Sequence, residues 1–172
     1  MINFISEDIV FKLKNKAILK KWITSTIEKK KRKTGDISFV LCSDAFLLEM
    51  NKEYLKHDTY TDIITFDYSD DTPLDSAKAD DSGGSKKKGN ISGDIFISID
   101  RVKENAKKFS PSNSAQGDKQ RKKRPNFEDE LHRVIIHGVL HLLGYKDKTK
   151  IAKAEMTKQE DLCLKALPKK QK

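Results

Sequence analysis

Two histidines and one aspartate late in the sequence have the spacing of a metal-binding triplet. His137 and His141 lie four residues apart in a segment whose apolar pattern predicts a helix over 127–143. Side chains at this spacing share one helix face with Cβ atoms about 5–6 Å apart, so two imidazoles can bind one ion. Gly144 is expected to end the helix and let the chain turn back. Asp147 then arrives as a third donor, giving H-x-x-x-H-x-x-x-x-x-D.

Three protein donors and one open position are typical of a catalytic rather than a structural zinc site. Bound zinc lowers the pKa of its water to about 7, which makes hydroxide available at neutral pH. The bland alternatives are that His137 and His141 bond to carboxylates on an ordinary helix face, or that all three residues only pack. His57 and His132 do not share this register, and we interpret them as surface residues or as neighbours of the site.

The residue after the first histidine argues against one class of zinc enzyme. Metalloproteases with the H-E-x-x-H motif have a glutamate there as general base. Gly138 occupies that position in this sequence. A peptidase of that mechanism would lack its base, whereas a small residue lets another element approach the helix closely.

Composition excludes further classes. The chain has 172 residues, 36% hydrophobic and 35% charged, and no stretch approaches the ~18 apolar residues of a membrane-spanning helix. Cys42 and Cys163 are the only cysteines, which excludes a disulfide scaffold and a cysteine-rich zinc ribbon. The first residues show no signal-peptide pattern. We therefore expect a cytoplasmic protein with no membrane contact.

The net charge of +9 favours a polyanionic partner such as nucleic acid. The basic residues gather in runs at 29–33, 86–88 and 119–124. Each run alone is as well explained by a solvated surface. Together they favour RNA or DNA contact without specifying a reaction.

The alternation of short apolar strands with amphipathic helices predicts an α+β fold. We expect a single domain over 1–172, built on one small mixed β-sheet of about four strands covered by helices, with the metal site on a central helix. The expected strands are 2–5, 36–42, 61–67 and 93–99, and the expected helices are 15–33 (ended by Gly35), 45–55, 101–109 (capped by Asp100), 127–143 and 150–167. Two polar segments, 69–92 and 110–125, are predicted to be flexible surface insertions.

Three blocks of sequence resemble one protein family. The segment HGVLHLLGY followed by an acidic residue resembles the YbeY family of single-strand-specific metallo-endoribonucleases that mature ribosomal RNA. MNKEYLKHDTYTDIITFDY (50–68) and GDIFISI (93–99) are similar to two further blocks of that family, in the same order. The blocks cover most of the chain outside the two polar segments.

The resemblance implies an endoribonuclease that hydrolyses single-stranded RNA with a bound metal. It implies Zn²⁺, one per chain, with His137, His141 and Asp147 as ligands and the two histidines in the catalytic centre. It also implies action at the 3′ end of small-subunit ribosomal RNA, a role in ribosome quality control, and contact with the small subunit or its associated proteins.

The sequence departs from the family pattern at two positions. Most members have histidine where this chain has Asp147, and a carboxylate ligand leaves room for other divalent metals such as manganese or magnesium. Leu55 replaces an arginine that could contact phosphate. The candidates for RNA contact here are Lys56, Arg101, Arg121, Lys122, Lys123 and Arg124.

Three polar residues at strand starts have two interpretations. Thr61, Asp62 and Asp94 can cap turns, which is the usual role of short polar side chains there. One of them could instead accept a hydrogen bond from a ligand histidine. Among functions, a non-catalytic RNA-binding or ribosome-associated factor with a structural metal, a zinc peptidase and a metal-free structural protein remain as alternatives.

Overall fold

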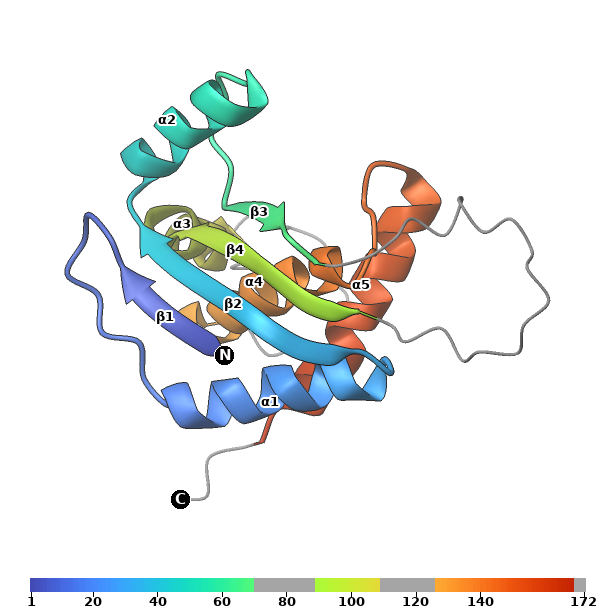
Figure 1. Cartoon of the computed structure of the whole chain (residues 1–172). Coiled ribbons are helices and arrows are strands. Elements are labelled where there is room, and N and C mark those ends of the chain that lie inside the picture. Colours follow the sequence, from blue (N-terminus) through green and yellow to red (C-terminus); the bar gives the residue numbers. More distant parts are fainter. Residues whose placement is uncertain (70–88, 109–125, 169–172) are drawn as a thin grey trace, which may run out of the picture.

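The computed structural model describes residues 1–69, 89–108 and 126–168. In these ranges five helices surround one four-stranded sheet (Figure 1). The elements in chain order are β1 (Ile2–Ser6), α1 (Lys16–Lys29), β2 (Lys33–Cys42), α2 (Asp44–Leu55), β3 (Ile63–Asp67), β4 (Asn90–Ser98), α3 (Ile99–Lys108), α4 (Phe127–Leu142) and α5 (Lys150–Lys165).

The sheet is mixed, with the strand order β1-β2-β4-β3. β1 and β4 both pair with β2 in parallel, and β3 pairs with β4 in the antiparallel sense. The two parallel pairs have helices in their connections, as parallel pairing requires a crossover. The α+β class and the four-stranded mixed sheet predicted from the sequence are confirmed.

Alternation along the strands gives the sheet one fully apolar face. β2 and β4 contribute six completely enclosed side chains to it: Ile37, Phe39, Leu41, Ile91, Ile95 and Ile97. α1 packs against β2, and α4 packs against β3 and β4 on this face, which lies in front of α4 in Figure 1. A smaller apolar cluster joins α2 to the other face around Leu47 and Ile64.

α4 is the centre of the fold. It contacts β3, β4, α1, α3 and α5, and most of its side chains are buried. Asn126 and Asp129 form the reciprocal hydrogen bonds of a capping box at its start. At Gly138 the helix approaches the sheet so closely that an added Cβ would lie 2.7 Å from Ile95 and 2.9 Å from Ile63. The absence of a side chain at Gly138 therefore sets the distance between α4 and the sheet.

The end of the first helix was predicted wrongly. α1 ends at Lys29 rather than at 33, because Lys31 takes a left-handed backbone conformation (φ 59°) and Lys33 already pairs with Asn90. Gly35 does not stop the helix. It lies inside β2 at an irregularity in the strand pairing, where a Cβ would collide with the Ser92 hydroxyl.

Several other boundaries also differ from expectation, those of β4 and α3 among them. β4 begins at Asn90, so the last residues of the predicted 69–92 insertion belong to a strand and Ile91 is fully buried. α3 includes Asp100, and its first turn is capped by the Ser98 hydroxyl, which accepts from the Arg101 amide. Positions 70–88 and 109–125, which hold most of the two predicted insertions, lie outside the described residues.

Both cysteines are buried as free thiols. Burial raises the pKa of the Cys42 thiol to about 12, with the negative charges of Asp8, Asp44 and Asp100 adding to the effect. Among the described residues, every helix is too short or too polar to cross a bilayer.

We predict that Gly138→Val lowers the free energy of unfolding by about 1–3 kcal/mol, because the new side chain overpacks the contact with Ile95 and Ile63. Helix propensity alone would favour the variant, because valine is a better helix former than glycine. Ala154→Val, at an exposed position of α5, is the control for introducing valine into a helix without such a contact. Urea unfolding followed by circular dichroism measures both. Equal destabilisation by the two variants would contradict the close contact as the cause.

Candidate metal centre

The structure brings the predicted triplet together. His137 and His141 project from the last turns of α4, and Asp147 follows in the connection to α5. Their Nε2 atoms are 2.9 Å apart, and Asp147 Oδ2 lies 3.7 Å from Nε2 of His137 and 3.8 Å from that of His141. Gly144, with φ at 91°, makes the predicted turn that returns the chain to the helix.

Each histidine is oriented through its other ring nitrogen. His137 Nδ1 is 2.7 Å from Glu160 Oε1, and His141 Nδ1 is 3.0 Å from the Tyr145 carbonyl oxygen. An ionised carboxylate and a backbone carbonyl carry no hydrogen to donate. Each Nδ1 is therefore the donor in its hydrogen bond. Each Nε2 then turns its lone pair toward the partner histidine and Asp147. Such acceptors commonly set the tautomer and ring direction of metal-ligating histidines.

Glu160 is itself fixed by Arg133. The guanidinium of Arg133, on α4, donates to Glu160 at 2.7 Å and to the neighbouring Asp161 at 3.0 Å. Burial opposes the charged form of Glu160, but the hydrogen bonds and positive charges of His137 and Arg133 outweigh it and lower the pKa of the carboxyl. Glu160 therefore remains an acceptor for His137 although its side chain is only 9% exposed.

The donor set fits a divalent cation. Two Nε2 lone pairs facing each other at 2.9 Å repel unless a cation or a shared proton lies between them. Tetrahedral zinc bound at about 2.0–2.1 Å by two imidazoles keeps their nitrogens roughly 3.3 Å apart, close to the spacing here. The carboxylate of Asp147 supplies negative charge and a third donor. Two nitrogens and one oxygen suit zinc and also tolerate harder divalent metals.

The histidines respond unequally to this environment. Burial opposes charge on His137, yet the hydrogen bond and charge of Glu160, with Asp147 and Asp62, raise its pKa above the ordinary value. Burial and the neighbouring His137 lower the pKa of His141. Without a metal, positive charge is therefore favoured on His137 over His141.

The candidate ligands remain accessible from solvent. The side chains of His137, His141 and Asp147 are 20%, 28% and 40% exposed. A structural zinc ion is normally enclosed by four protein ligands. Three partly exposed donors leave room for water or a substrate atom at the remaining position.

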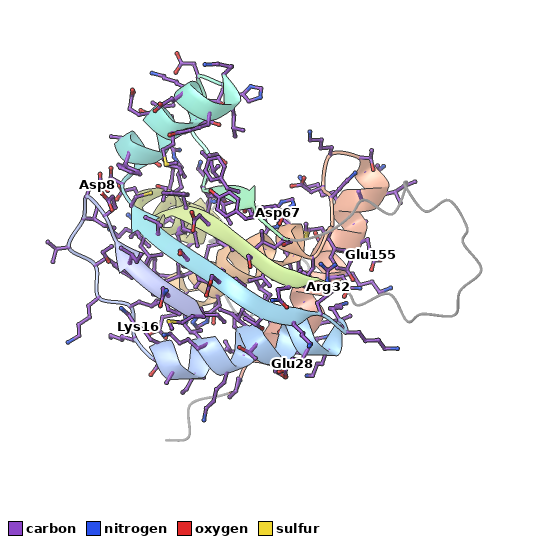
Figure 2. The ribbon with its side chains drawn as sticks, in the orientation of Figure 1. Asp8, Lys16, Glu28, Arg32, Asp67 and Glu155 are labelled. Carbon is purple, nitrogen blue, oxygen red and sulfur yellow. The ribbon has the colours of Figure 1, made fainter. Side chains whose placement is uncertain are left out.

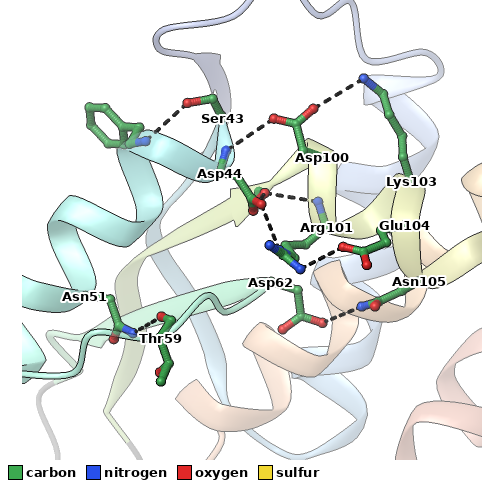
Figure 3. Close-up of polar contacts among 12 residues, drawn as sticks. Ser43, Asp44, Asn51, Thr59, Asp62, Asp100, Arg101, Lys103, Glu104 and Asn105 are labelled. Atoms are coloured by element: carbon green, nitrogen blue, oxygen red, sulfur yellow. Dashed lines mark hydrogen bonds and ion pairs between the residues drawn. The ribbon is translucent and has the colours of Figure 1, made fainter.

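The residues expected beside the ligands have other partners. The Asp62 carboxylate accepts from Asn105 Nδ2 at 3.3 Å, and its carbonyl accepts from the Ser98 amide (Figure 3). The negative charge of Asp62 contributes to raising the pKa of His137, but the hydrogen bond from His137 Nδ1 goes to Glu160. The Thr61 hydroxyl donates to the Ile63 carbonyl at 3.1 Å, which matches the turn-capping interpretation.

Asp94 lies on the other face of the sheet from α4. It follows Gly93 and precedes Ile95, and both of these neighbours face α4 at Leu142 and Gly138. Burial, with the charge and hydrogen bond of Asp94, raises the pKa of Tyr68. Asp94 therefore acts on Tyr68 rather than on a ligand histidine.

Two candidates for RNA contact can be located. Arg101 pairs with Asp44 at 2.8 Å and with Glu104 at 2.7 Å, and its guanidinium lies 4.4 Å from the centre of the Tyr60 ring. Figure 3 shows Arg101 tying α2 to α3, which is a structural use of its charge. Lys56 is exposed in a left-handed conformation just after α2. Arg121, Lys122, Lys123 and Arg124 lie outside the described residues.

Sequence analysis missed Glu160 and Arg133. One signal was available: Glu160 is spaced at helical intervals from Met156 and Cys163, which form the buried face of α5. An acid on an apolar helix face needs a partner, because burying an unpaired charge is costly. Its partners, Arg133 and His137, could not be chosen without the packing of α5 on α4.

We predict that Glu160→Gln weakens Zn²⁺ binding about 10- to 100-fold, because His137 loses its anionic acceptor. Asp161→Asn is the matched control, since Asp161 also accepts from Arg133 but does not contact a histidine. Competition with a chromophoric chelator measures both affinities. Equal weakening by the two variants would mean that Glu160 acts through Arg133 alone.

Comparisons with known proteins agree with this architecture. A family model described as "Endoribonuclease YbeY" matches residues 1–168. A protein of that name from Cytophaga hutchinsonii is 40% identical over 163 residues, covering 95% of this chain and 93% of its own. A protein of the same name from Parabacteroides distasonis is 40% identical over 167 residues, covering 97% of this chain and 96% of its own.

A solution structure from Thermotoga maritima shares the fold. Its TM-score is 0.54 at 23% sequence identity, and the match covers 97% of this chain and 89% of that one. The match to the family model extends over nearly all of the sequence, including the helix and turn that carry the three donors. This chain belongs to the Endoribonuclease YbeY family.

Proposed function

We propose that this protein is a metal-dependent endoribonuclease that hydrolyses phosphodiester bonds in single-stranded RNA. The observation that carries the proposal is the convergence of two oriented Nε2 lone pairs and one carboxylate at a solvent-accessible point. Membership of a family whose relatives are named endoribonucleases supplies the reaction class.

His137, His141 and Asp147 would hold the metal, one ion per chain, with Zn²⁺ as the first candidate and other divalent ions admitted by the aspartate. When bound, the metal would activate water and polarise a phosphoryl oxygen. Glu160 keeps the His137 ring in place through Nδ1, and the Tyr145 carbonyl does the same for His141. Because these contacts exist before substrate arrives, the ligands need not reorganise during the reaction.

The natural substrate that we propose is ribosomal RNA, near the 3′ end of the small-subunit RNA, with a further role in ribosome quality control. The excess of 35 basic over 26 acidic residues supports a polyanionic substrate. Contact with the small ribosomal subunit or its associated proteins belongs to the same proposal, as does action in the cytoplasm.

Two alternatives are weaker on specific grounds. A structural metal in a non-catalytic RNA-binding factor would favour an enclosed site, whereas these donors are 20–40% exposed. A peptidase would need a base where Gly138 packs against Ile95 and Ile63. That position has no space for a glutamate side chain.

We predict that His141→Ala lowers cleavage of single-stranded RNA at least ~100-fold and reduces bound metal, because one of the three donors is lost. His57→Ala removes an exposed histidine and serves as the control. Metal analysis of the purified proteins beside a cleavage assay on ribosomal RNA fragments measures both effects. Undiminished cleavage by the His141 variant would refute the proposed catalytic centre.

Chelation should separate a catalytic metal from a structural one. The main apolar core is assembled from β-strand and helix side chains and does not include the three donors. We therefore predict that a strong chelator abolishes RNA cleavage while the far-UV circular dichroism spectrum at 25 °C is retained. Loss of the folded signal together with activity would favour the structural alternative.

A further inference from the structure

A basic pocket adjoins the loop that carries the third metal donor. Its volume is about 230 Å³, and it is lined by Lys30, Arg32, Leu143, Gly144 and Tyr145. The two cations come from the turn between α1 and β2, where Figure 2 labels Arg32, and the other three residues follow the end of α4. The pocket therefore combines the basic run 29–33 with the turn that leads to Asp147.

Lys30 is positioned in this pocket by neutral groups. Its ammonium donates to the Tyr145 hydroxyl at 2.9 Å and to Gln159 Oε1 at 2.6 Å, and it lies 5.2 Å from the centre of the Tyr145 ring. These contacts hold the side chain in place without cancelling its charge. A lysine fixed in this way needs little reordering to receive an anion.

Arg32 adds a second cation with a defined direction. Its Nε donates to the Gly89 carbonyl at 3.2 Å, which ties the guanidinium to the chain just before β4. Guanidinium and ammonium groups together are the usual ligands of phosphate, the first through a planar fork and the second as a point charge. Leu143 and the Tyr145 ring supply the apolar floor.

The pocket and the metal centre share Tyr145, and each is contacted by one of two adjacent residues of α5. Tyr145 lines the pocket with its side chain while its carbonyl accepts from His141. On α5, Gln159 accepts from Lys30 and the next residue, Glu160, accepts from His137. The pocket therefore adjoins the residues that orient both histidines through Nδ1.

We propose that Lys30 and Arg32 form a phosphate subsite that binds a backbone phosphate of the RNA substrate outside the metal centre. The proposal deepens the function proposed above, on which it rests for the identity of the substrate. It assigns a role to two members of the basic run 29–33 and none to Lys29, Lys31 and Lys33, which are exposed.

The first test uses the full-length, metal-free protein and inorganic phosphate, so that it does not depend on cleavage. Titration calorimetry should detect phosphate binding by the wild type and by His141→Ala. Lys30→Gln and Arg32→Gln should each weaken it at least fivefold, while Lys29→Gln and Lys31→Gln should not. Binding that is lost in His141→Ala but kept in Lys30→Gln would place the phosphate at the histidines and overturn the assignment.

The second test separates RNA binding from catalysis in the metal-loaded enzyme. For a short single-stranded RNA we predict that Lys30→Gln raises KM about 3- to 10-fold with kcat within twofold, because the contact acts equally before and during the reaction. Lys30→Arg should restore KM. The slope of log affinity against log salt should fall by about 0.7, the value of one phosphate contact on a single strand.

Each result decides the assignment. Lys29→Gln and Lys31→Gln remove the same charge from the same run, so equal effects from all three lysines would overturn the subsite and leave only general attraction. Thermal melting must show that Lys30→Gln and Arg32→Gln are folded. The calorimetric test uses both variants, so that its conclusion does not depend on a single substitution. If the wild type does not cleave RNA but phosphate binds as predicted, the proposed function is wrong and the assignment of a phosphate site to Lys30 and Arg32 is kept.

Discussion

The contact between α4 and the sheet at Gly138 is the constraint on which the rest of the structure depends. A helix that carries a side chain at this position cannot lie so close to Ile95 and Ile63. The sheet and the helices around α4 bury nine of its sixteen residues, and a strip with Arg133, His137 and His141 faces α5 and the turn after α4. In metalloproteases with the H-E-x-x-H motif, the position of Gly138 holds the glutamate that acts as general base. In this chain it holds the glycine that lets α4 lie close to the sheet.

Orientation of the donors is distributed over separate parts of the chain. α4 supplies the two imidazoles, α5 supplies the acceptor for His137, and the turn supplies both the acceptor for His141 and the third donor. Arg133 closes the arrangement by holding Glu160 from the same helix that carries the ligands. The ring directions are therefore set by packing between elements, and the cost of ordering them is met during folding rather than on metal binding.

Local patterns predicted the parts of the molecule whose causes are local. The i, i+4 histidines and the Gly144 turn depend on neighbouring residues, and each lies where the sequence indicates. The strands followed from alternation, although the pairing of Lys33 with Asn90 extended two of them beyond their apolar centres. The end of α1 was missed because the basic residues at 30–33 suit a helix as well as a strand, and only pairing in the sheet decides between them.

The contacts missed from the sequence are those that join distant segments. Glu160 and His137 are 23 residues apart, and Lys30 and Gln159 are 129 apart. No periodicity links such pairs, because their meeting depends on how α5 lies against α4 and α1. Arg101, which stays a predicted RNA contact, also makes contacts between distant segments, since it pairs with Asp44 and lies over the Tyr60 ring.

The adjacency of Gln159 and Glu160 has a thermodynamic consequence. One turn of α5 contacts both the proposed phosphate subsite and the metal centre, since Gln159 contacts Lys30 and Glu160 contacts His137. Any restriction of that turn imposed by a ligand at one site reduces the disorder that a ligand at the other must overcome. Thermodynamic linkage makes this effect reciprocal. If bound phosphate strengthens metal binding by some free energy, bound metal strengthens phosphate binding by the same amount. If both proposed sites are occupied, this single helical turn would make the affinity for an anion and the affinity for a cation interdependent.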